Sequence, residues 1–403
     1  MPAVETDTRS LGAQKLAQAQ ELLRDSALDS WLLLVRESVE RPDPNLRFFL
    51  DQEFTWNSYF LVTRDKTAAL VATGDSPDLI SSGIFDDVRT YKEGPRASFL
   101  QLLEEMNPRT IGINVSMDDP LADGLTAGLR DHLVETVAGT PFASRLTSAE
   151  KLLALLRGIK LPAEHKRVKR AVDETERMFD RVAREFRIGM RASEIADLFH
   201  GEADRAQVPT AWSRRYCPTV VVGAKAAVGH VRPADEPIHK GCIIHVDFGI
   251  IRDQYCSDLQ RMWYVAAEGG EAVPEAVLRA HAAIVGGIEV AAKALKPGIA
   301  GWEVDLGVRE HLTSLGYPEY PHALGHHLGR ACHDGGGVLG PRWERYGTAP
   351  FEVVREGSVY TLEPSIYLKG HGLVSLEEDV VVRSSGAEFL SRFPRELPVV
   401  ILR

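Results

Sequence analysis

Hydrophobic positions along the first third of the chain recur at helical and strand spacings in alternation. Residues 11–25 carry apolar side chains at helical spacing, and helical patterns also occur near 97–106 and 121–133. This alternation predicts an α/β domain, which we place at residues 1–155. The apolar runs typical of strands are Trp31–Val35, Tyr59–Thr63, Ala68–Ala72 and Thr110–Val115.

The pattern changes near residue 155. Residues 147–160 are typical of a capped helix, and the charged stretch 164–207 has the periodicity of two helices. Further helices are predicted at 274–295 and 304–315. The strand-like runs around them are joined by short turns, which favours antiparallel pairing. The sequence therefore predicts an α+β domain over residues 156–403.

Residues 241–264 are typical of a β-hairpin, because two runs rich in Ile, Val, Phe, Tyr and Trp flank a polar pair. With Arg252–Asp253 as the loop, Asp247 and Asp258 would lie opposite each other on the two strands. The Cβ atoms of such a pair are about 4.5–5.5 Å apart. Two carboxylates that close on buried strands repel unless a positive charge lies between them. Solvated aspartates on an exposed hairpin are the alternative, but the apolar neighbours favour a metal site.

A second predicted hairpin has the same arrangement. Residues 358–368 and 373–382 flank a Lys-Gly-His-Gly loop, and in that register Glu363 pairs with Glu377. The alternative for Glu377 and the two acidic residues after it is a solvated edge. Because Glu377 lies within Leu- and Val-rich sequence, where an unpaired charge is costly, we favour a buried site.

The segment between the hairpins, residues 321–337, is rich in glycine and histidine. Glycine lets a backbone approach a site closely, and imidazole is a ligand for divalent metals. The four histidines are His322, His326, His327 and His333. Two Asp, two Glu and one His would carry four negative charges, which two divalent cations neutralise. Such hard ligands favour Mn, Co, Fe or Mg, and zinc also accepts carboxylates.

Composition narrows the class of protein. The 403 residues are 44% hydrophobic and 26% charged, with a net charge of -10, which argues against a nucleic-acid surface. Four cysteines without CxxC spacing are expected to be reduced thiols in a cytoplasmic protein. No basic, apolar leader opens the sequence, and no apolar run approaches the roughly 20 residues that span a bilayer, so we expect no membrane association.

These segments resemble the motifs of the pita-bread-fold superfamily of methionine aminopeptidases, Xaa-Pro aminopeptidases and prolidases. HVDFGIIRDQYCSDLQR resembles its first Asp motif and HALGHHLG its metal-His motif, while TLEPSIY and LEEDVVV resemble its two Glu motifs. VGHVRP resembles an upstream motif that carries a histidine. Together the motifs cover residues 160–390. The resemblance implies five metal ligands: Asp247, Asp258, His326, Glu363 and Glu377.

The resemblance also implies catalytic and substrate-binding roles. Two metal ions would hold an activated water, Glu363 would transfer its proton to the leaving nitrogen, and His230 and His333 would bind the substrate carbonyl. His322 would line the pocket on the leaving-group side. A structural role for His322 and His327 is an equal alternative.

Within the superfamily the sequence resembles prolidases most. This implies an Xaa-Pro dipeptidase with two divalent ions, Mn²⁺ first and Co²⁺ or Zn²⁺ as alternatives, acting as a homodimer. An Xaa-Pro aminopeptidase on longer peptides is the second hypothesis, and a non-catalytic binding module is the third. Ser375 and Gln260 stand where the family commonly has Arg and Thr, and no counterpart of a substrate-binding Arg occurs in 346–356.

Overall fold

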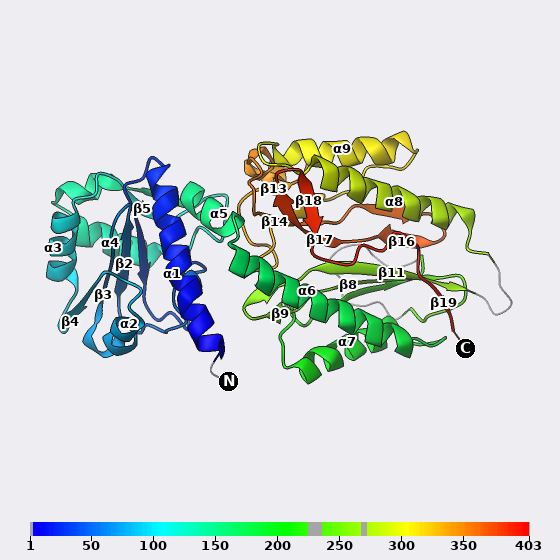
Figure 1. Ribbon diagram of the computed structural model, residues 1–403, viewed down its shortest axis with the longest axis horizontal. Helices are drawn as coiled ribbons and strands as arrows, with labels where there is room; N and C mark the ends of the chain where they lie inside the picture. Colours follow the sequence, from blue (N-terminus) through cyan, green and yellow to red (C-terminus); the bar gives the residue numbers. More distant parts are fainter. Residues whose placement is uncertain (1–2, 225–235, 267–271, 403) are drawn as a thin grey trace. The chain divides into compact units, whose positions relative to one another are not determined.

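The computed structural model describes residues 3–224, 236–266 and 272–402. The chain folds into two compact units, residues 1–157 and 158–403. The expected fold class, an α/β unit followed by an α+β unit, is confirmed (Figure 1). Within these described ranges, no helix has the length and apolar character needed to cross a membrane.

The first unit is a six-stranded sheet with helices on both faces, in the order β4-β3-β2-β1-β5-β6. Its strands are β1 (Ser30–Val35), β2 (Ser58–Thr63), β3 (Thr67–Ala72), β4 (Asp87–Tyr91), β5 (Ile111–Ile113) and β6 (Leu146–Ser148). Its helices are α1 (Ala3–Arg24), α2 (Ser76–Ser82), α3 (Arg96–Met106), α4 (Ala127–Val137) and α5 (Glu150–Gly158), with 3₁₀ turns η1 (Leu46–Phe48), η2 (Thr73–Asp75) and η3 (Pro141–Arg145).

Strand β1 explains why the apolar runs of this unit are continuous. Trp31 and Leu33 join the hydrophobic core beneath α1, α2 and α5, whereas Leu32 and Leu34 join the core beneath α3 and α4. Successive strand residues point to opposite faces, so a strand covered on both sides needs apolar residues throughout. The four predicted strands are confirmed. The polar edge strand β4 was missed, because its sequence DVRTY lacks such a run.

The second unit contains the predicted site. Its helices are α6 (Pro162–Val182), α7 (Ala192–Ala206), α8 (Glu275–Ala294) and α9 (Gly301–Ser314), with 3₁₀ turns η4 (Ala183–Glu185), η5 (Glu344–Tyr346) and η6 (Ala349–Phe351). Its strands are β7 (Thr219–Val222), β8 (Ile243–Phe248), β9 (Ile251–Arg252), β10 (Tyr255–Cys256), β11 (Leu259–Ala266), β12 (Gly325–His326), β13 (Val338–Leu339), β14 (Val359–Leu362), β15 (Ser365–Leu368), β16 (Gly372–Ser375), β17 (Glu378–Arg383), β18 (Gly386–Phe389) and β19 (Val399–Ile401).

Two layers of strands lie between two pairs of helices in this unit (Figure 1). One layer has the order β19-β11-β8-β7, and its outer face packs on α6 and α7 through Phe248, which contacts Phe179 and Phe199. The other layer contains β14 to β18 and packs on α8. Ile243 joins the core on the α8 side. Asp247 is four residues further along β8, so it points between the two layers.

The first acidic hairpin has a different register from the one predicted. Arg252 pairs with Tyr255, and the loop is therefore Asp253–Gln254 rather than Arg252–Asp253. Both loop residues have positive φ, 51° and 67°, as a two-residue type I′ turn requires. Asp247 consequently lies opposite Gln260 and not opposite Asp258. A shift of two residues preserves the face of the strand, so both aspartates still point to the same side.

The second acidic hairpin has the predicted register. Ser365 pairs with Ser375 and Leu362 with Glu378, which are the partners expected when Glu363 lies opposite Glu377. The two strands are interrupted at these positions, where β14 gives way to β15 and β16 to β17. Both glutamates therefore lie at a break between ladders, beside the first layer, where Glu377 forms an isolated bridge with Gln260.

Gly249 makes the close approach of the two strands in the first hairpin possible. A Cβ atom at this position would lie 2.0 Å from the Ser257 backbone oxygen. We predict that Gly249→Ala lowers the free energy of unfolding by about 1–3 kcal/mol, because backbone atoms must move to relieve the clash. Urea denaturation followed by circular dichroism measures this change.

The matched control is Gly201→Ala in α7. A Cβ atom there has no neighbour within 4 Å. In a helix interior, a change from glycine to alanine raises the free energy of unfolding by about 1 kcal/mol. Equal effects of the two substitutions would contradict the close approach at Gly249.

Candidate metal and peptidase site

A cavity of about 720 Å³ lies within the second unit, between the two strand layers. Every predicted site residue in the described ranges lines it. These residues are Asp247, Asp258, His322, His326, His333, Glu363 and Glu377. His230 lies outside the described residues.

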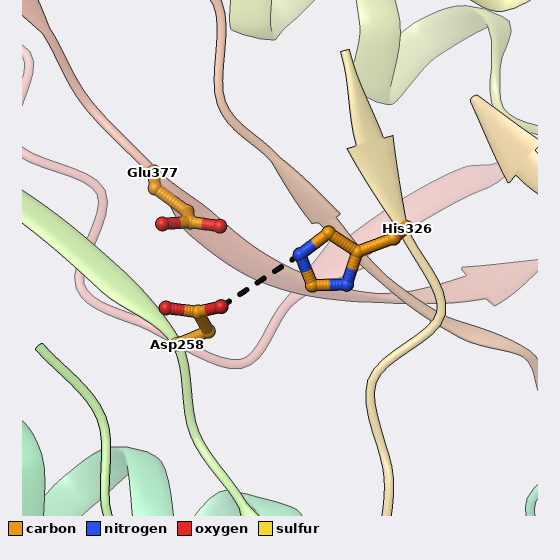
Figure 2. Close-up of side chains that lie close together, drawn as sticks. All are labelled: Asp258, His326 and Glu377. Carbon is orange, nitrogen blue, oxygen red and sulfur yellow. Dashed lines mark ion pairs between the residues drawn. The ribbon is translucent and has the colours of Figure 1, made fainter. Parts of the chain in front are cut away.

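Three of the predicted ligands form a tight group. Ligand atoms of Asp258, His326 and Glu377 all lie within 4.8 Å of one another (Figure 2). Glu363 lies next to this group, because its Oε1 is 3.7 Å from His326 Nε2, the same distance as Asp258 Oδ2. Asp247 adjoins it, since the negative charge of Asp247 is close enough to raise the pKa of Asp258. The fold thus brings together five side chains that span residues 247 to 377.

The His326 ring is oriented by its own backbone segment. Its Nδ1 lies 3.1 Å from the His327 carbonyl oxygen, to which it donates a hydrogen bond. In the neutral ring Nε2 is then the nitrogen that carries the lone pair, and it faces the carboxylates of Asp258 and Glu363. Gly325 allows this placement, since a Cβ atom there would lie 1.9 Å from the Thr361 carbonyl oxygen. Steric crowding therefore explains why the residue before His326 is a glycine.

Burial and mutual repulsion disfavour the ionised forms of the four carboxyl groups. Burial raises the pKa of Asp247 from 3.8 to about 7. Burial and then the charge of Asp247 raise the pKa of Asp258 and Glu363 well above their usual values, and burial and the charge of Asp258 do so for Glu377. Such groups are stable as anions when a cation lies between them.

Two carboxylate oxygens of the predicted ligands have no hydrogen-bond partner among the described residues, although they are buried. They are Asp247 Oδ1 and Asp258 Oδ1. An unpaired buried acceptor is costly unless another group satisfies it. Oxygen ligands from four carboxylates and one imidazole nitrogen are the donors that divalent Mn, Co or Zn accept. The residues present therefore fit a divalent metal centre.

The interpretation of residues 377–379 as a solvated acidic edge is wrong. All three side chains are buried. Glu378 points away from the cavity and forms an ion pair with Arg261, 2.9 Å apart. Asp379 accepts a hydrogen bond from the Asp258 backbone nitrogen at 3.1 Å. The three acidic side chains of this run therefore have three different surroundings.

The remaining histidines of the glycine-rich segment differ in their surroundings. His333 is exposed to the cavity, and its ring centroid is 4.3 Å from that of His326. His322 also lines the cavity, with Nε2 2.7 Å from Ser365 Oγ. His327 stacks on Tyr360 at 4.0 Å, and burial lowers its pKa to about 3, which favours a packing role.

Two residues near the site were missed by the sequence reasoning. Cys332 donates its S–H to Asp258 Oδ2 at 2.9 Å, and only its position beside His333 could have indicated this. Arg345 is one residue before the range in which a substrate-binding arginine was sought. Its guanidinium is 5.0 Å from the ring of Tyr346, which lines the cavity, and it donates to the Pro321 carbonyl oxygen at 2.6 Å.

Known proteins resemble this chain in sequence. The protein YkvY of Bacillus subtilis is 29% identical over 281 residues, 69% of this chain and 71% of its own length. The Xaa-Pro dipeptidase of Pyrococcus furiosus is 26% identical over 279 residues, 68% of this chain and 74% of the relative. Both matches extend over about two thirds of the chain.

Solved structures resemble the whole fold. The Xaa-Pro dipeptidase from Bacillus anthracis superposes with a TM-score of 0.73 at 20% identity, covering 96% of this chain and 100% of that structure. The X-Pro aminopeptidase from Thermotoga maritima gives a TM-score of 0.70 at 23% identity, covering 96% and 99%. The expected pita-bread fold is thereby confirmed. The sequence profile of metallopeptidase family M24 matches residues 166–384, more than half of the chain, so the chain belongs to that family.

Proposed function

We propose that this metallopeptidase is an Xaa-Pro dipeptidase that uses two divalent metal ions, with Mn²⁺ as the preferred metal. The observation that carries the proposal is the convergence of four carboxyl groups, two of them buried and two half-buried, and His326 Nε2 on one cavity. Asp247, Asp258, His326, Glu363 and Glu377 would hold the ions. When bound, a pair of divalent ions polarises the substrate carbonyl and lowers the pKa of water.

The side chains around the centre have separate roles in this proposal. Glu363 would accept a proton from water and pass it to the leaving nitrogen, since its Oε1 faces His326 while Oε2 is held by Gln260 at 3.3 Å. His333, exposed to the cavity, would donate a hydrogen bond to the substrate carbonyl oxygen. His230 is assigned the same role from its motif alone. His322 would line the leaving-group side.

The preference for a dipeptide rests on the relatives and on Arg345. The curated relative from Pyrococcus furiosus is named an Xaa-Pro dipeptidase. Arg345 supplies a positive charge beside the cavity, and this charge lowers the pKa of His322, although burial and the charge of Arg309 are larger causes. A guanidinium at this position suits the terminal carboxylate of a dipeptide. An Xaa-Pro aminopeptidase on longer peptides is the second candidate, because that activity names one of the solved structures of this fold.

We predict that the Mn²⁺-loaded protein has a kcat/KM for Ala-Pro that is at least about tenfold higher than its kcat/KM for Ala-Pro-Ala. A charge-assisted contact to the dipeptide carboxylate, worth about 1.5–3 kcal/mol, would produce that difference. Chromatography that monitors the release of alanine measures both rates. Efficient cleavage of the tripeptide would favour the aminopeptidase instead.

Asp258→Asn tests the metal centre directly. We predict that it lowers kcat/KM by more than about 100-fold and reduces the bound metal measured by mass spectrometry, because an amide is a weaker ligand than a carboxylate. The fold should persist, as circular dichroism would show. The matched control is Asp173→Asn on α6, where the side chain is exposed and pairs with Lys169. Full activity of Asp258→Asn would refute the assignment.

The metal-free protein should lose stability as the pH rises. The folded pKa of Asp247 is raised from 3.8 to about 7, so the folded protein holds a proton that the unfolded chain has released. Stability therefore falls between about pH 4 and pH 7, and divalent metal should oppose this fall by binding the anions. Thermal unfolding with EDTA and with MnCl₂ measures both effects. A metal-free melting temperature that rises over this interval would contradict the burial of these acids.

We further propose a cytoplasmic homodimer. The four cysteines are buried and free, which suits a reducing compartment. The first unit carries none of the predicted site residues, and we assign it to covering the site, restricting substrate length or holding the partner subunit. Light scattering of the purified chain measures the assembly, and a monomer at micromolar concentration would exclude the dimer.

A further inference from the structure

Gln260 lies where the two acidic hairpins meet. Its Cα is opposite Asp247 in the pairing of β8 with β11. Its backbone oxygen accepts a hydrogen bond from the Glu377 backbone nitrogen at 3.3 Å, which joins the first strand layer to the second. The backbone of Gln260 is thus paired with that of Asp247 in the first hairpin and with that of Glu377 in the second.

The side chain of Gln260 reaches a third carboxylate. Its Nε2 donates to Glu363 Oε2 at 3.3 Å. Its Oε1 accepts from Ser375 Oγ at 2.7 Å and lies 3.1 Å from His245 Nε2. The side chains of Gln260, Ser375 and His245 are all buried, with at most 8% of each residue exposed. In such surroundings these hydrogen bonds have little competition from water.

The chemistry of the partners fixes the orientation of the amide. An ionised Glu363 only accepts hydrogen bonds, so the NH₂ group must face it. The amide oxygen then faces two donors, the Ser375 hydroxyl and the His245 ring N–H. Ser375 Oγ also lies 2.9 Å from the carbonyl oxygen of Pro364, the residue after Glu363. Ser375 therefore contacts both the amide that holds Glu363 and the backbone that carries it.

We propose that Gln260 is a positioning residue that orients the Glu363 carboxylate, and that Ser375 acts through Gln260. A neutral amide donates a hydrogen bond without adding a positive charge that would repel divalent cations. The catalytic part of this inference rests on the proposed function. Its metal-binding part does not, because ion affinity is measured without substrate.

The first test compares Gln260→Met, Ser375→Ala and Ser375→Thr. Met keeps the length of the side chain but removes the donor, and Thr keeps the hydroxyl that Ala removes. Calorimetric titration of the EDTA-treated full chain with MnCl₂ should show affinity weakened by about 10–100-fold for Gln260→Met. Ser375→Ala should show a smaller loss, and Ser375→Thr should restore binding to within about threefold of the parent chain.

The matched control is Thr175→Val. Thr175 and Ser257, the residue before Asp258, form a buried hydroxyl pair at 2.7 Å, and neither hydroxyl bonds to the side chain of a predicted ligand. Thr175→Val should lower the melting temperature and leave Mn²⁺ affinity unchanged. A loss of affinity in this control equal to that in Gln260→Met would overturn the positioning role, because general loosening would then explain both.

The double variant decides whether Ser375 acts through Gln260. Once Gln260 is Met, Ser375→Ala should change the Mn²⁺ affinity by less than about twofold, since the amide that Ser375 holds is gone and only its contact with the Pro364 carbonyl oxygen remains. Equal losses in the two backgrounds would overturn this coupling. With Ala-Pro as substrate, Gln260→Met should lower kcat more than it raises KM. If the parent chain binds Mn²⁺ but does not cleave Ala-Pro, the proposed function fails, and the affinity cycle still decides the role of Gln260.

Discussion

The structure of the second unit depends on gathering four carboxyl groups in one place. Asp247, Asp258, Glu363 and Glu377 converge on a cavity between two strand layers, and burial raises the pKa of each. A protein can hold such groups as neutral acids or as anions around cations. A metal centre uses the second alternative, so the repulsion that disfavours the metal-free anions becomes the source of metal affinity.

The neighbouring strand residues show how the fold separates these carboxylates from ordinary ion pairs. Glu378 follows Glu377 directly, but it points to the opposite side of β17, where Arg261 neutralises it at 2.9 Å. Arg261 in turn follows Gln260 on β11, and the side chain of Gln260 faces the cavity. The two-residue period of a strand thus sends the arginine to one face and the neutral amide to the other. Arg261 neutralises the outer acid, and the inner acids are the ones that we propose as metal ligands.

Sequence periodicity predicted most of this arrangement, and turn chemistry explains its error. The second hairpin was placed in the correct register because glycines at 370 and 372 mark its loop, with φ of 85° and 108°. In the first hairpin the loop residues Asp253 and Gln254 include no glycine, although both adopt positive φ. The register was therefore wrong by two residues. Since two is a full strand period, both aspartates were still predicted on the correct face.

Contacts between the layers have no comparable signal in the sequence. Gln260 and Ser375 are 115 positions apart and on different sheets, and their hydrogen bond exists only because β11 and β16 lie against each other beside the cavity. Periodicity states which face a residue occupies, but not which residue of another layer it meets. A motif can identify ligands, because each must carry a particular donor atom. A supporting residue can be any side chain that completes the hydrogen bonds of its neighbours, so its identity follows from packing and is recognised only in the folded chain.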